Sequence, residues 1–220
     1  MGIRRGLAAG ALLLATPALA GGILGTVRLA GAPPGPARLQ VTRDRSSCGG
    51  AAPDESVVAA GGKLANVVVT VKGAPSRSAA RTLVLDQHQC RFVPHVLAAP
   101  VGSTLDIVNS DPVLHNVHGY RGRATAFNVA LPARGQRVAR KLDGPGAVRV
   151  RCDVHGWMSA WVVVADGPSA VSGADGTFAI PEVPPGTWTV TAWHEKLGER
   201  STQVTVPASG QASVDFSFGG

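Results

Sequence analysis

After residue 20, the chain consists of short segments in which apolar and polar residues alternate, or in which Val and Thr predominate. In one example, Val148, Val150 and Cys152 alternate with Arg149 and Arg151. A period of two residues places the two sets on opposite faces of a β-strand. The spacing typical of an amphipathic helix is hard to find, so the pattern predicts an all-β fold. The predicted strands cover residues 23–30, 38–43, 64–72, 81–86, 95–98, 103–109, 136–142, 147–152, 160–165, 177–180, 186–194, 200–206 and 212–218.

The 28 Gly and 16 Pro residues separate short strands in the way that is typical of β-sandwiches and barrels. Two small, polar, Pro-containing stretches, 73–80 and 165–169, are predicted domain boundaries. We predict a central domain at 80–166 and a discontinuous second domain, 22–79 plus 167–220. The alternative is three pieces in series, of which the first merely extends the central domain. About fifty C-terminal residues alone would bury a poor core, which favours the discontinuous arrangement.

The first twenty residues are predicted to be a secretory signal peptide. Arg4 and Arg5 form a positive start, residues 7–14 an apolar core, and residues 18–20 (ALA) a small-residue cleavage site. The alternative is a membrane anchor that is retained, but the apolar run is too short to span a bilayer, and no later segment is long enough. The mature chain is therefore expected to be periplasmic or secreted, without a transmembrane helix.

The charge of the chain is basic, at +7, and removal of Arg4 and Arg5 lowers it to +5. This excess favours an acidic protein partner or an anionic surface. The Arg residues are scattered and only 5% of the residues are aromatic, whereas a nucleic-acid-binding face would combine clustered basic residues with stacking aromatics. We therefore expect no nucleic acid partner.

Residue types that bind soft metals gather in two short stretches. Cys152, His155 and Met158 follow one another at intervals of three, and His115 lies in a second stretch upstream. One Cys, two His and a weak axial Met form the ligand set of a mononuclear blue-copper site. Met is a poor zinc ligand, and a structural zinc site would need four strong ligands. The sequence therefore predicts one type 1 copper ion per chain.

The other two cysteines, Cys48 and Cys90, form an even remainder in a chain that is expected to be exported. An oxidising compartment favours a disulfide between them. The alternative is two unpaired buried thiols.

Two neighbours of the ligands have predicted supporting roles. Asn116 follows His115 and is expected to hydrogen-bond across to the Cys152 loop, as groups around metal ligands commonly do. Trp157 is a candidate for a partner-docking surface around an exposed His155, because aromatic residues are favoured at interface centres. The alternative role for Trp157 is simple packing.

With these residues in place, the segments 112–118 (PVLHNVH) and 152–158 (CDVHGWM) resemble the two ligand loops of amicyanin, a plastocyanin-like cupredoxin. The resemblance covers roughly residues 81–166. It implies a Greek-key β-sandwich with copper bound by His115, Cys152, His155 and axial Met158. It also implies one-electron transfer between periplasmic redox proteins, such as an amine dehydrogenase and a c-type cytochrome, and a place among methylamine utilization proteins.

The chain departs from amicyanin in the Cys152 loop. Val154 and Gly156 stand where amicyanin has prolines, and Trp157 replaces a Phe. Arg151 precedes the cysteine where an aromatic residue or His is expected. The loss of the prolines is expected to loosen the loop.

The segment 172–192 resembles a hairpin of the carboxypeptidase regulatory-like domain, a transthyretin-like β-sandwich. Asp175-Gly176 and Pro185-Gly186 are turn signals on either side of alternating apolar residues. In that family, strands such as 25–31 and 65–72 precede the hairpin without interruption. The resemblance therefore implies a cupredoxin-like domain inserted in, or flanked by, a second β-sandwich that carries no catalytic residues.

These observations predict an electron carrier and not an enzyme. The alternatives are a copper-trafficking protein without a redox role, and a non-redox interaction or carbohydrate-binding β-sandwich protein. A second metal site at His88, His95 and His118 is a further alternative, against surface or internally hydrogen-bonded imidazoles at these positions. His194-Glu195 is interpreted as a polar pair at a strand end.

Overall fold

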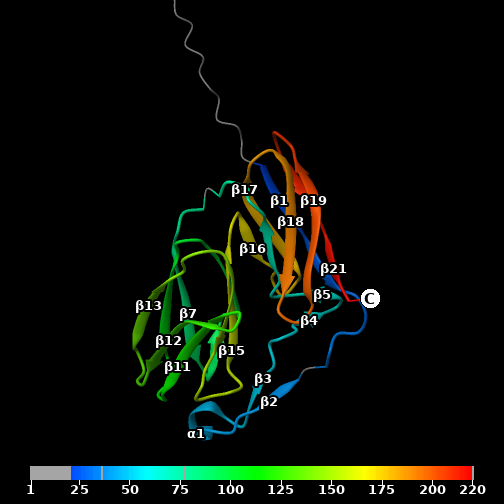
Figure 1. Cartoon of the computed structure of the whole chain (residues 1–220). Coiled ribbons are helices and arrows are strands. Elements are labelled where there is room, and N and C mark those ends of the chain that lie inside the picture. Colours follow the sequence, from blue (N-terminus) through cyan, green and yellow to red (C-terminus); the bar gives the residue numbers. More distant parts are fainter. Residues whose placement is uncertain (1–20, 36, 77, 220) are drawn as a thin grey trace, which may run out of the picture.

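The computed structural model describes residues 21–35, 37–76 and 78–219, and the predicted signal peptide lies outside the described residues. The described part is built from β-strands and the four-residue helix α1 (Arg45–Cys48) (Figure 1). The predicted all-β fold is confirmed. None of the helical structure in these ranges is long and apolar enough to cross a lipid bilayer.

The central strands form two sheets that pack face to face. One sheet has the order β13-β10-β7-β8, and the other has the order β12-β11-β14-β15-β9. Their bounds are β7 (Thr82–His88), β8 (Arg91–Val93), β9 (Val96–Pro100), β10 (Thr104–Asn109), β11 (His115–Arg121), β12 (Ala124–Leu131), β13 (Arg137–Lys141), β14 (Gly146–Arg151) and β15 (Ser159–Ala165).

Alternating burial explains why these two sheets pack together. Along β10, Leu105 and Ile107 are fully buried while Asp106 between them is partly exposed. On the opposite sheet, Val148 and Val150 point into the same core, and Arg149 between them is exposed. The hairpin β11–β12 is followed by β13 in the other sheet, and β14 then returns to pair with β11. This return beside an earlier strand is the connection of a Greek key.

A second pair of sheets combines strands from both ends of the chain. One contains β17-β1-β5-β4 with β20 and β21 alongside β1, and the other has the order β16-β6-β18-β19. Their apolar inner faces share a core of their own. Their bounds are β1 (Gly21–Leu29), β4 (Ala59–Ala60), β5 (Lys63–Leu64), β6 (Val68–Val71), β16 (Ser169–Val171), β17 (Thr177–Val183), β18 (Gly186–His194), β19 (Gly198–Val206), β20 (Gln211–Ser213) and β21 (Phe216–Phe218).

The two pairs of sheets meet along β9 and β15 on one side and β6, β16 and β18 on the other. A small cluster of buried apolar residues fills the contact, with the Trp161 and Trp193 rings edge to face at 5.1 Å between centroids. Glu195, in the turn after β18, accepts a hydrogen bond from the Trp161 indole N–H at 2.9 Å, and its other carboxylate oxygen is hydrogen-bonded to Nε2 of His95. The pair His194-Glu195 is therefore part of an internal contact.

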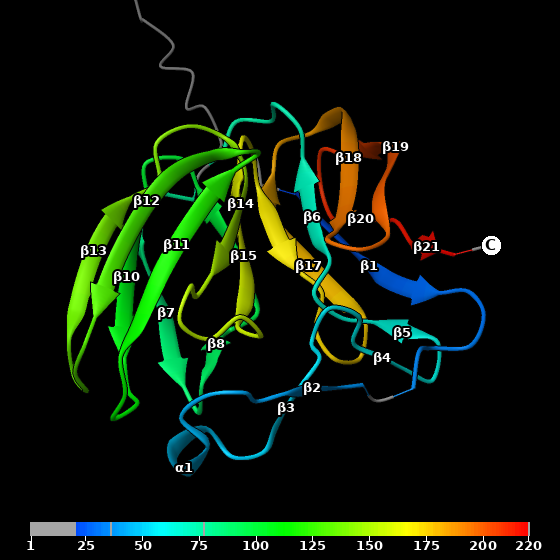
Figure 2. The same ribbon diagram turned by 60° about the horizontal axis from the view of Figure 1, so that its bottom comes forward.

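Residues 38–53, the cap segment, leave the second pair of sheets and reach across one end of the central pair. The cap segment contains β2 (Arg38–Gln40), α1 and β3 (Ala51–Pro53), and β2 and β3 pair with each other as a separate two-stranded sheet. In Figures 1 and 2 it lies below the ends of β7, β8, β11 and β15. The predicted strand 38–43 is thus shorter than expected, and its apolar Val41 is fully buried.

The strands β11 and β12 were not predicted. In β12, six of the first seven positions are exposed or half-buried because it lies at the edge of its sheet. Small and polar residues on an edge strand do not produce the alternation by which a strand is recognised.

Candidate metal centre

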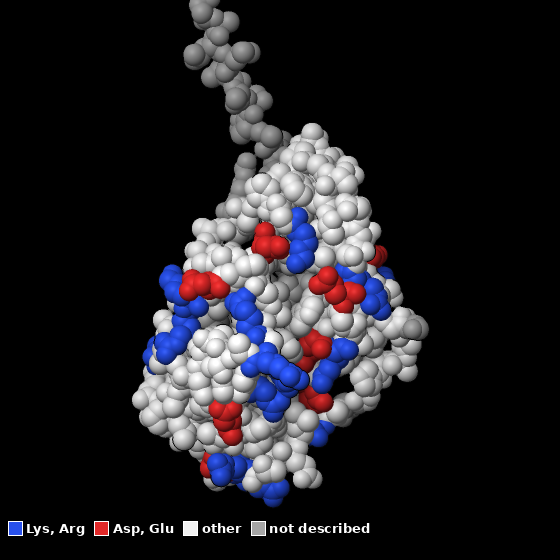
Figure 3. Space-filling view, in the orientation of Figure 1, with Lys and Arg blue, Asp and Glu red and all other residues white. Residues whose placement is uncertain are grey.

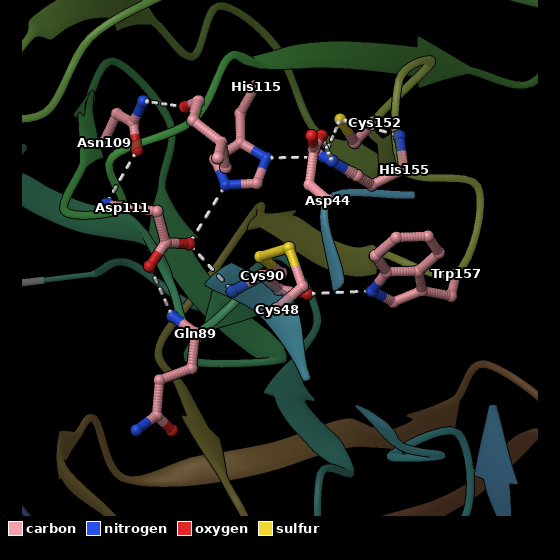
Figure 4. Close-up of a disulfide and its surroundings, with 11 residues drawn as sticks. Asp44, Cys48, Gln89, Cys90, Asn109, Asp111, His115, Cys152, His155 and Trp157 are labelled. Carbon is pink, nitrogen blue, oxygen red and sulfur yellow. Dashed lines mark hydrogen bonds and ion pairs between the residues drawn. A yellow bond between two sulfur atoms is a disulfide. The ribbon is translucent and has the colours of Figure 1, made fainter. Parts of the chain in front are cut away.

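The structure brings His115, Cys152 and His155 together from two loops at one end of the central sheets. Nδ1 of His115 lies 2.9 Å from Nδ1 of His155, and the Cys152 sulfur lies 3.8 Å from the same His155 atom. One donor atom from each residue lies within 4.8 Å of the other two, and all three side chains are buried. Figure 4 shows the imidazoles and the sulfur converging.

The position of Cys152 follows from the alternation of β14. The strand ends at Arg151, and Cys152 continues the inward series of Val148 and Val150, with 1% of its surface exposed. The chain then turns through a tight loop, in which the Met158 N–H donates to the His155 carbonyl at 2.9 Å. The His155 N–H faces the Cys152 sulfur at 3.4 Å. Met158, also 1% exposed, belongs to the same apolar core cluster as Cys152, and its carbonyl accepts from the Cys152 N–H at 3.4 Å.

His115 is positioned by a polar turn after β10. The Asn109 side chain donates to the Val113 and Leu131 carbonyls, both at 2.9 Å, and accepts from the Asp111 N–H at 2.9 Å. Asp111 Oδ2 then lies 3.0 Å from His115 Nε2. The Asp111 carboxylate also accepts from the backbone N–H groups of Gln89 and Cys90. His115 is therefore held at one nitrogen, which leaves Nδ1 directed toward Cys152 and His155.

The protonation of these groups follows from their contacts. Burial works to lower the pKa of His115, but hydrogen bonds with Asp111 and Cys152 outweigh it and raise that pKa to about 9. Burial works to raise the pKa of the Cys152 thiol, but hydrogen bonds from the His115 side chain and the Asn116 backbone lower it below its usual value. Burial lowers the pKa of His155, against the raising effect of Asp44. Cys152 is therefore favoured as a thiolate and His155 as an uncharged imidazole, which are the forms that metals bind, whereas His115 is favoured as a protonated imidazole that a metal ion would have to deprotonate.

The donor set fits a soft or borderline metal ion. The Cys152 sulfur and two imidazole nitrogens are buried within reach of one point, and Met158, the only methionine among the described residues, is buried in the same core cluster as Cys152. Thiolate, imidazole and thioether donors are typical of copper sites. The second group of metal-binding residue types, Cys90 with Asp111 and His115, offers no free thiolate because Cys90 is in a disulfide.

Asn116 lies between the two ligand loops. Its Nδ2 donates to Asp153 Oδ2 at 2.8 Å, and its Oδ1 accepts from the Asp153 N–H at 2.6 Å. His118 also contacts the Asp153 carboxylate, with its Nδ1 3.0 Å from Oδ2, and its Nε2 lies 2.9 Å from Thr125 Oγ1. His118 is therefore directed away from the His115–Cys152 cluster.

The cap segment contributes a residue that sequence reasoning missed. Asp44 Oδ2 lies 2.8 Å from His155 Nε2, and the cap segment is joined to the central sheets by a disulfide between Cys48 and Cys90 (Figure 4). His155 has 0% of its surface exposed. The expectation of an exposed His155 is therefore wrong, because the cap segment covers the edge of the ring that its own loop leaves open.

Trp157 is half-buried and lies beside the ligands. Its ring centroid is 5.0 Å from that of His155, and its indole N–H donates to the Cys90 carbonyl at 3.1 Å. This contact fixes Trp157 against the disulfide-linked part of the chain.

The remaining histidines lie apart from one another. His88 is exposed, and His95 is buried between the Ser159 carbonyl, at 3.1 Å from its Nδ1, and the carboxylate of Glu195. With His118 turned to Asp153, the structure does not bring His88, His95 and His118 together among the described residues. His194 is buried and accepts backbone hydrogen bonds from Lys196 and Leu197 at Nδ1.

Comparisons with known proteins find similarity over only part of the chain. No protein-family model matches the chain. A plastocyanin from Ulva pertusa is 28% identical over 78 residues, which cover 32% of this chain and 80% of that protein. This relative supports a cupredoxin domain within the chain.

Several solved structures are similar to part of this chain. A purple cupredoxin from Nitrosopumilus maritimus covers 39% of this chain and 99% of its own, with 24% identity and a TM-score of 0.34. A reduced amicyanin variant covers 44% and 97%, with 23% identity and a TM-score of 0.35. A copper-containing nitrite reductase from Thermus scotoductus covers 50% and 25%, with 21% identity and a TM-score of 0.33.

Proposed function

We propose that this chain is a type 1 copper protein that carries single electrons between redox partners. The observation that carries the proposal is the buried convergence of the His115 and His155 Nδ1 atoms on the Cys152 sulfur. Met158 is the proposed weak axial ligand, because it is buried in the same loop and core. A copper ion held by this set supplies one-electron redox chemistry.

The surroundings favour electron transfer because the ligands are held in place. Asp111 fixes His115, the loop hydrogen bonds fix His155 and Met158, and Asn116 joins the two ligand loops. Ligands that cannot move change little when the charge of the metal changes. Hydrogen bonds that hold the candidate ligands in place in both loops therefore favour the proposed electron transfer.

The same burial argues against an enzyme. A catalytic metal site keeps a coordination position open to substrate. His115 and His155 each have 0% of their surface exposed, and Cys152 and Met158 have 1%. It also argues against copper trafficking, since a site that passes on its metal needs ligands within reach of the receiving protein.

The location and partners are proposed on separate grounds. The predicted signal at residues 1–20 and a disulfide between Cys48 and Cys90 both fit the periplasm or the extracellular space. The net positive charge favours acidic partners. On the face shown in Figure 3, basic and acidic side chains are interspersed, which gives no continuous basic surface for nucleic acid. By resemblance, a dehydrogenase and a c-type cytochrome are the proposed donor and acceptor.

We also propose that residues 80–166 form the copper domain and that 22–79 with 167–220 form a transthyretin-like domain into which it is inserted. Separate apolar cores and the pairing of β1 with β17 support this division. The cap segment is the exception, because it starts in the outer domain and ends against the copper domain.

The experiment that tests the function is the visible and electron-spin-resonance spectrum of residues 21–220 after addition of one equivalent of copper(II). We expect an intense thiolate-to-copper band, a narrow hyperfine splitting and reversible one-electron reduction. The Cys152→Ala variant should lose the band and keep its far-ultraviolet circular dichroism. A pale, ordinary copper(II) spectrum in the wild-type protein would exclude a type 1 centre.

A further inference from the structure

The outer edge of the His155 ring is closed by a residue from a distant part of the chain. Asp44 precedes His155 by 111 positions, and its Oδ2 lies 2.8 Å from Nε2. The ring has 0% exposure, whereas the Asp44 side chain is 38% exposed on its outer side. Asp44 therefore stands between the imidazole and solvent.

The Asp44 side chain contacts His155 and does not make the helix-capping hydrogen bond that is usual at its position. Asp44 occupies the N-cap position of α1, where an Asp side chain normally accepts a hydrogen bond from the first turn of the helix. Here it makes no such bond, and its backbone has φ of 52° in the left-handed region, which is uncommon for a residue other than Gly. A conformation of this kind persists where surrounding contacts impose it, and such residues cluster at functional sites.

The cap segment is anchored on both sides of this contact. The Arg45 side chain donates to the carbonyl of buried Val41 at 2.9 Å, and Cys48 is bonded to Cys90. Cys90 in turn donates its backbone N–H to Asp111, the residue that holds His115. The two carboxylates that contact the imidazoles are therefore linked by a short path that contains one disulfide and one hydrogen bond.

Asp44 and Asp111 have the same relationship to the two imidazoles. Each carboxylate contacts Nε2 of its own ring, at 2.8 Å for His155 and 3.0 Å for His115, while the two Nδ1 atoms face each other. A carboxylate at one imidazole nitrogen fixes the tautomer and directs the other nitrogen to a metal. The first pair is formed across domains, and the second within one loop.

We propose that Asp44 is a positioning residue for His155, and that the cap segment closes this ligand off from solvent and from direct contact with a redox partner. Asp44 keeps the proton on Nε2, so that Nδ1 is free for the metal. The inference rests on the proposed function for the identity of the metal, but the tautomer and the closed edge do not depend on which metal binds. A partner that docks at this end of the molecule meets the cap segment before it meets the imidazole.

The tautomer and the closed edge are tested in the apoprotein. We expect nitrogen-15 nuclear magnetic resonance to show the His155 proton on Nε2 in the wild type and in Asp44→Asn, whose amide oxygen still accepts. In Asp44→Ala the proton should redistribute between the two nitrogens. Diethyl pyrocarbonate, followed by peptide mapping, should modify exposed His88 in all proteins and His155 only in Asp44→Ala. The control is Asp143→Ala, which removes an exposed carboxylate elsewhere.

The consequence for metal binding is tested with cobalt(II), a probe that requires no redox activity. Loss of a group that orients a metal ligand typically weakens metal affinity about 10- to 100-fold. We expect this loss in Asp44→Ala, a smaller loss in Asp44→Asn and none in Asp143→Ala.

The two proposals fail in different ways. If wild-type His155 is modified as readily as His88, or if Asp44→Ala leaves the tautomer and the cobalt(II) affinity unchanged, the role of Asp44 is wrong even where the copper spectrum is of type 1. If the copper spectrum is ordinary while the tautomer and the protection of His155 change in Asp44→Ala, the electron-transfer function is wrong and the role of Asp44 stands.

Discussion

Asn116 and Asp153 exchange two hydrogen bonds between the segments that carry the candidate metal ligands. The Asn116 amide donates to the Asp153 carboxylate at 2.8 Å and accepts from the Asp153 N–H at 2.6 Å. Each residue adjoins a ligand, since Asn116 follows His115 and Asp153 follows Cys152. The Asn116 amide, through its N–H and its oxygen, therefore helps to fix the distance between the His115 imidazole and the Cys152 sulfur.

Asn116→Ala is predicted to weaken metal binding without unfolding the chain. The substitution leaves the Asp153 N–H without its acceptor and lets the two loops separate. Changes to such supporting groups typically reduce metal affinity about 10- to 100-fold. Competition with a chelator of known cobalt(II) affinity measures the loss.

The matched control for this prediction is Asn128→Ala. Asn128 belongs to the same network but is exposed, and its amide lies 3.5 Å from Asp153. We expect a smaller change in affinity for this variant. Because Asn128 Oδ1 also accepts from the Asn116 amide at 3.0 Å, equal effects of the two substitutions would mean that Asn116 alone does not join the two segments.

Met158→Leu is predicted to keep the thiolate-to-copper band and to raise the reduction potential. The axial ligand tunes the potential of a type 1 centre, and removal of a thioether donor disfavours copper(II) relative to copper(I). Leu and Met have similar volumes, so the free energy of unfolding should fall by less than about 1.5 kcal/mol. Cyclic voltammetry of wild type and variant measures the shift. An unchanged potential would show that Met158 is packing and not a ligand.

The parts of the centre that are predictable from sequence are those encoded over short distances. The alternation of Val148, Val150 and Cys152 gives the direction of the thiol, and the spacing of His155 and Met158 gives the loop. Asp111 is also near His115 in sequence, but its role is hidden because an Asp before Pro112 equally signals a turn.

The role of Asp44 is not predictable from local pattern because its partner is 111 residues away. The one available signal is indirect: Asp44 lies four residues before Cys48, so a disulfide to Cys90 brings it to the central sheets. Strand β12 escapes prediction for a different reason, since its edge position exposes residues on both faces. Both the Asp44–His155 contact and the edge position of β12 depend on pairing between distant segments, which the periodicity of the sequence does not reveal.

Removal of the Cys48–Cys90 disulfide is predicted to lower the free energy of unfolding by about 2 to 4 kcal/mol. The bond spans 42 residues and ties the cap segment to the central sheets, so its loss frees a long loop in the unfolded chain. Urea unfolding of the double variant Cys48→Ala/Cys90→Ala measures the effect. Wild-type protein in excess dithiothreitol serves as the control and should match the variant, which already lacks the bond. A midpoint that neither treatment changes would contradict the prediction.

Glu195 is predicted to make the stability of the domain contact dependent on pH. Its side chain is 9% exposed and accepts from both His95 and the Trp161 indole. Burial works to raise the pKa of Glu195, but the hydrogen bond from His95 outweighs it and lowers that pKa below its ordinary value of 4.5. Because the folded-state pKa is the lower one, the stabilisation is complete above pH 4.5 and is lost as the pH falls through the folded-state value.

Glu195→Gln tests this dependence, because an amide has one acceptor atom where the carboxylate offers one to each donor. We expect the variant to lose roughly 1.5 to 3 kcal/mol at neutral pH, the range for hydrogen bonds to charged groups. The difference from wild type should shrink in acid, where Glu195 itself becomes protonated. Thermal unfolding from neutral pH down to pH values below 4.5 measures it. Glu199→Gln, an exposed carboxyl on the same hairpin, should show no such trend, and a difference that stays constant in acid would mean that the ionised form of Glu195 is not what stabilises the contact.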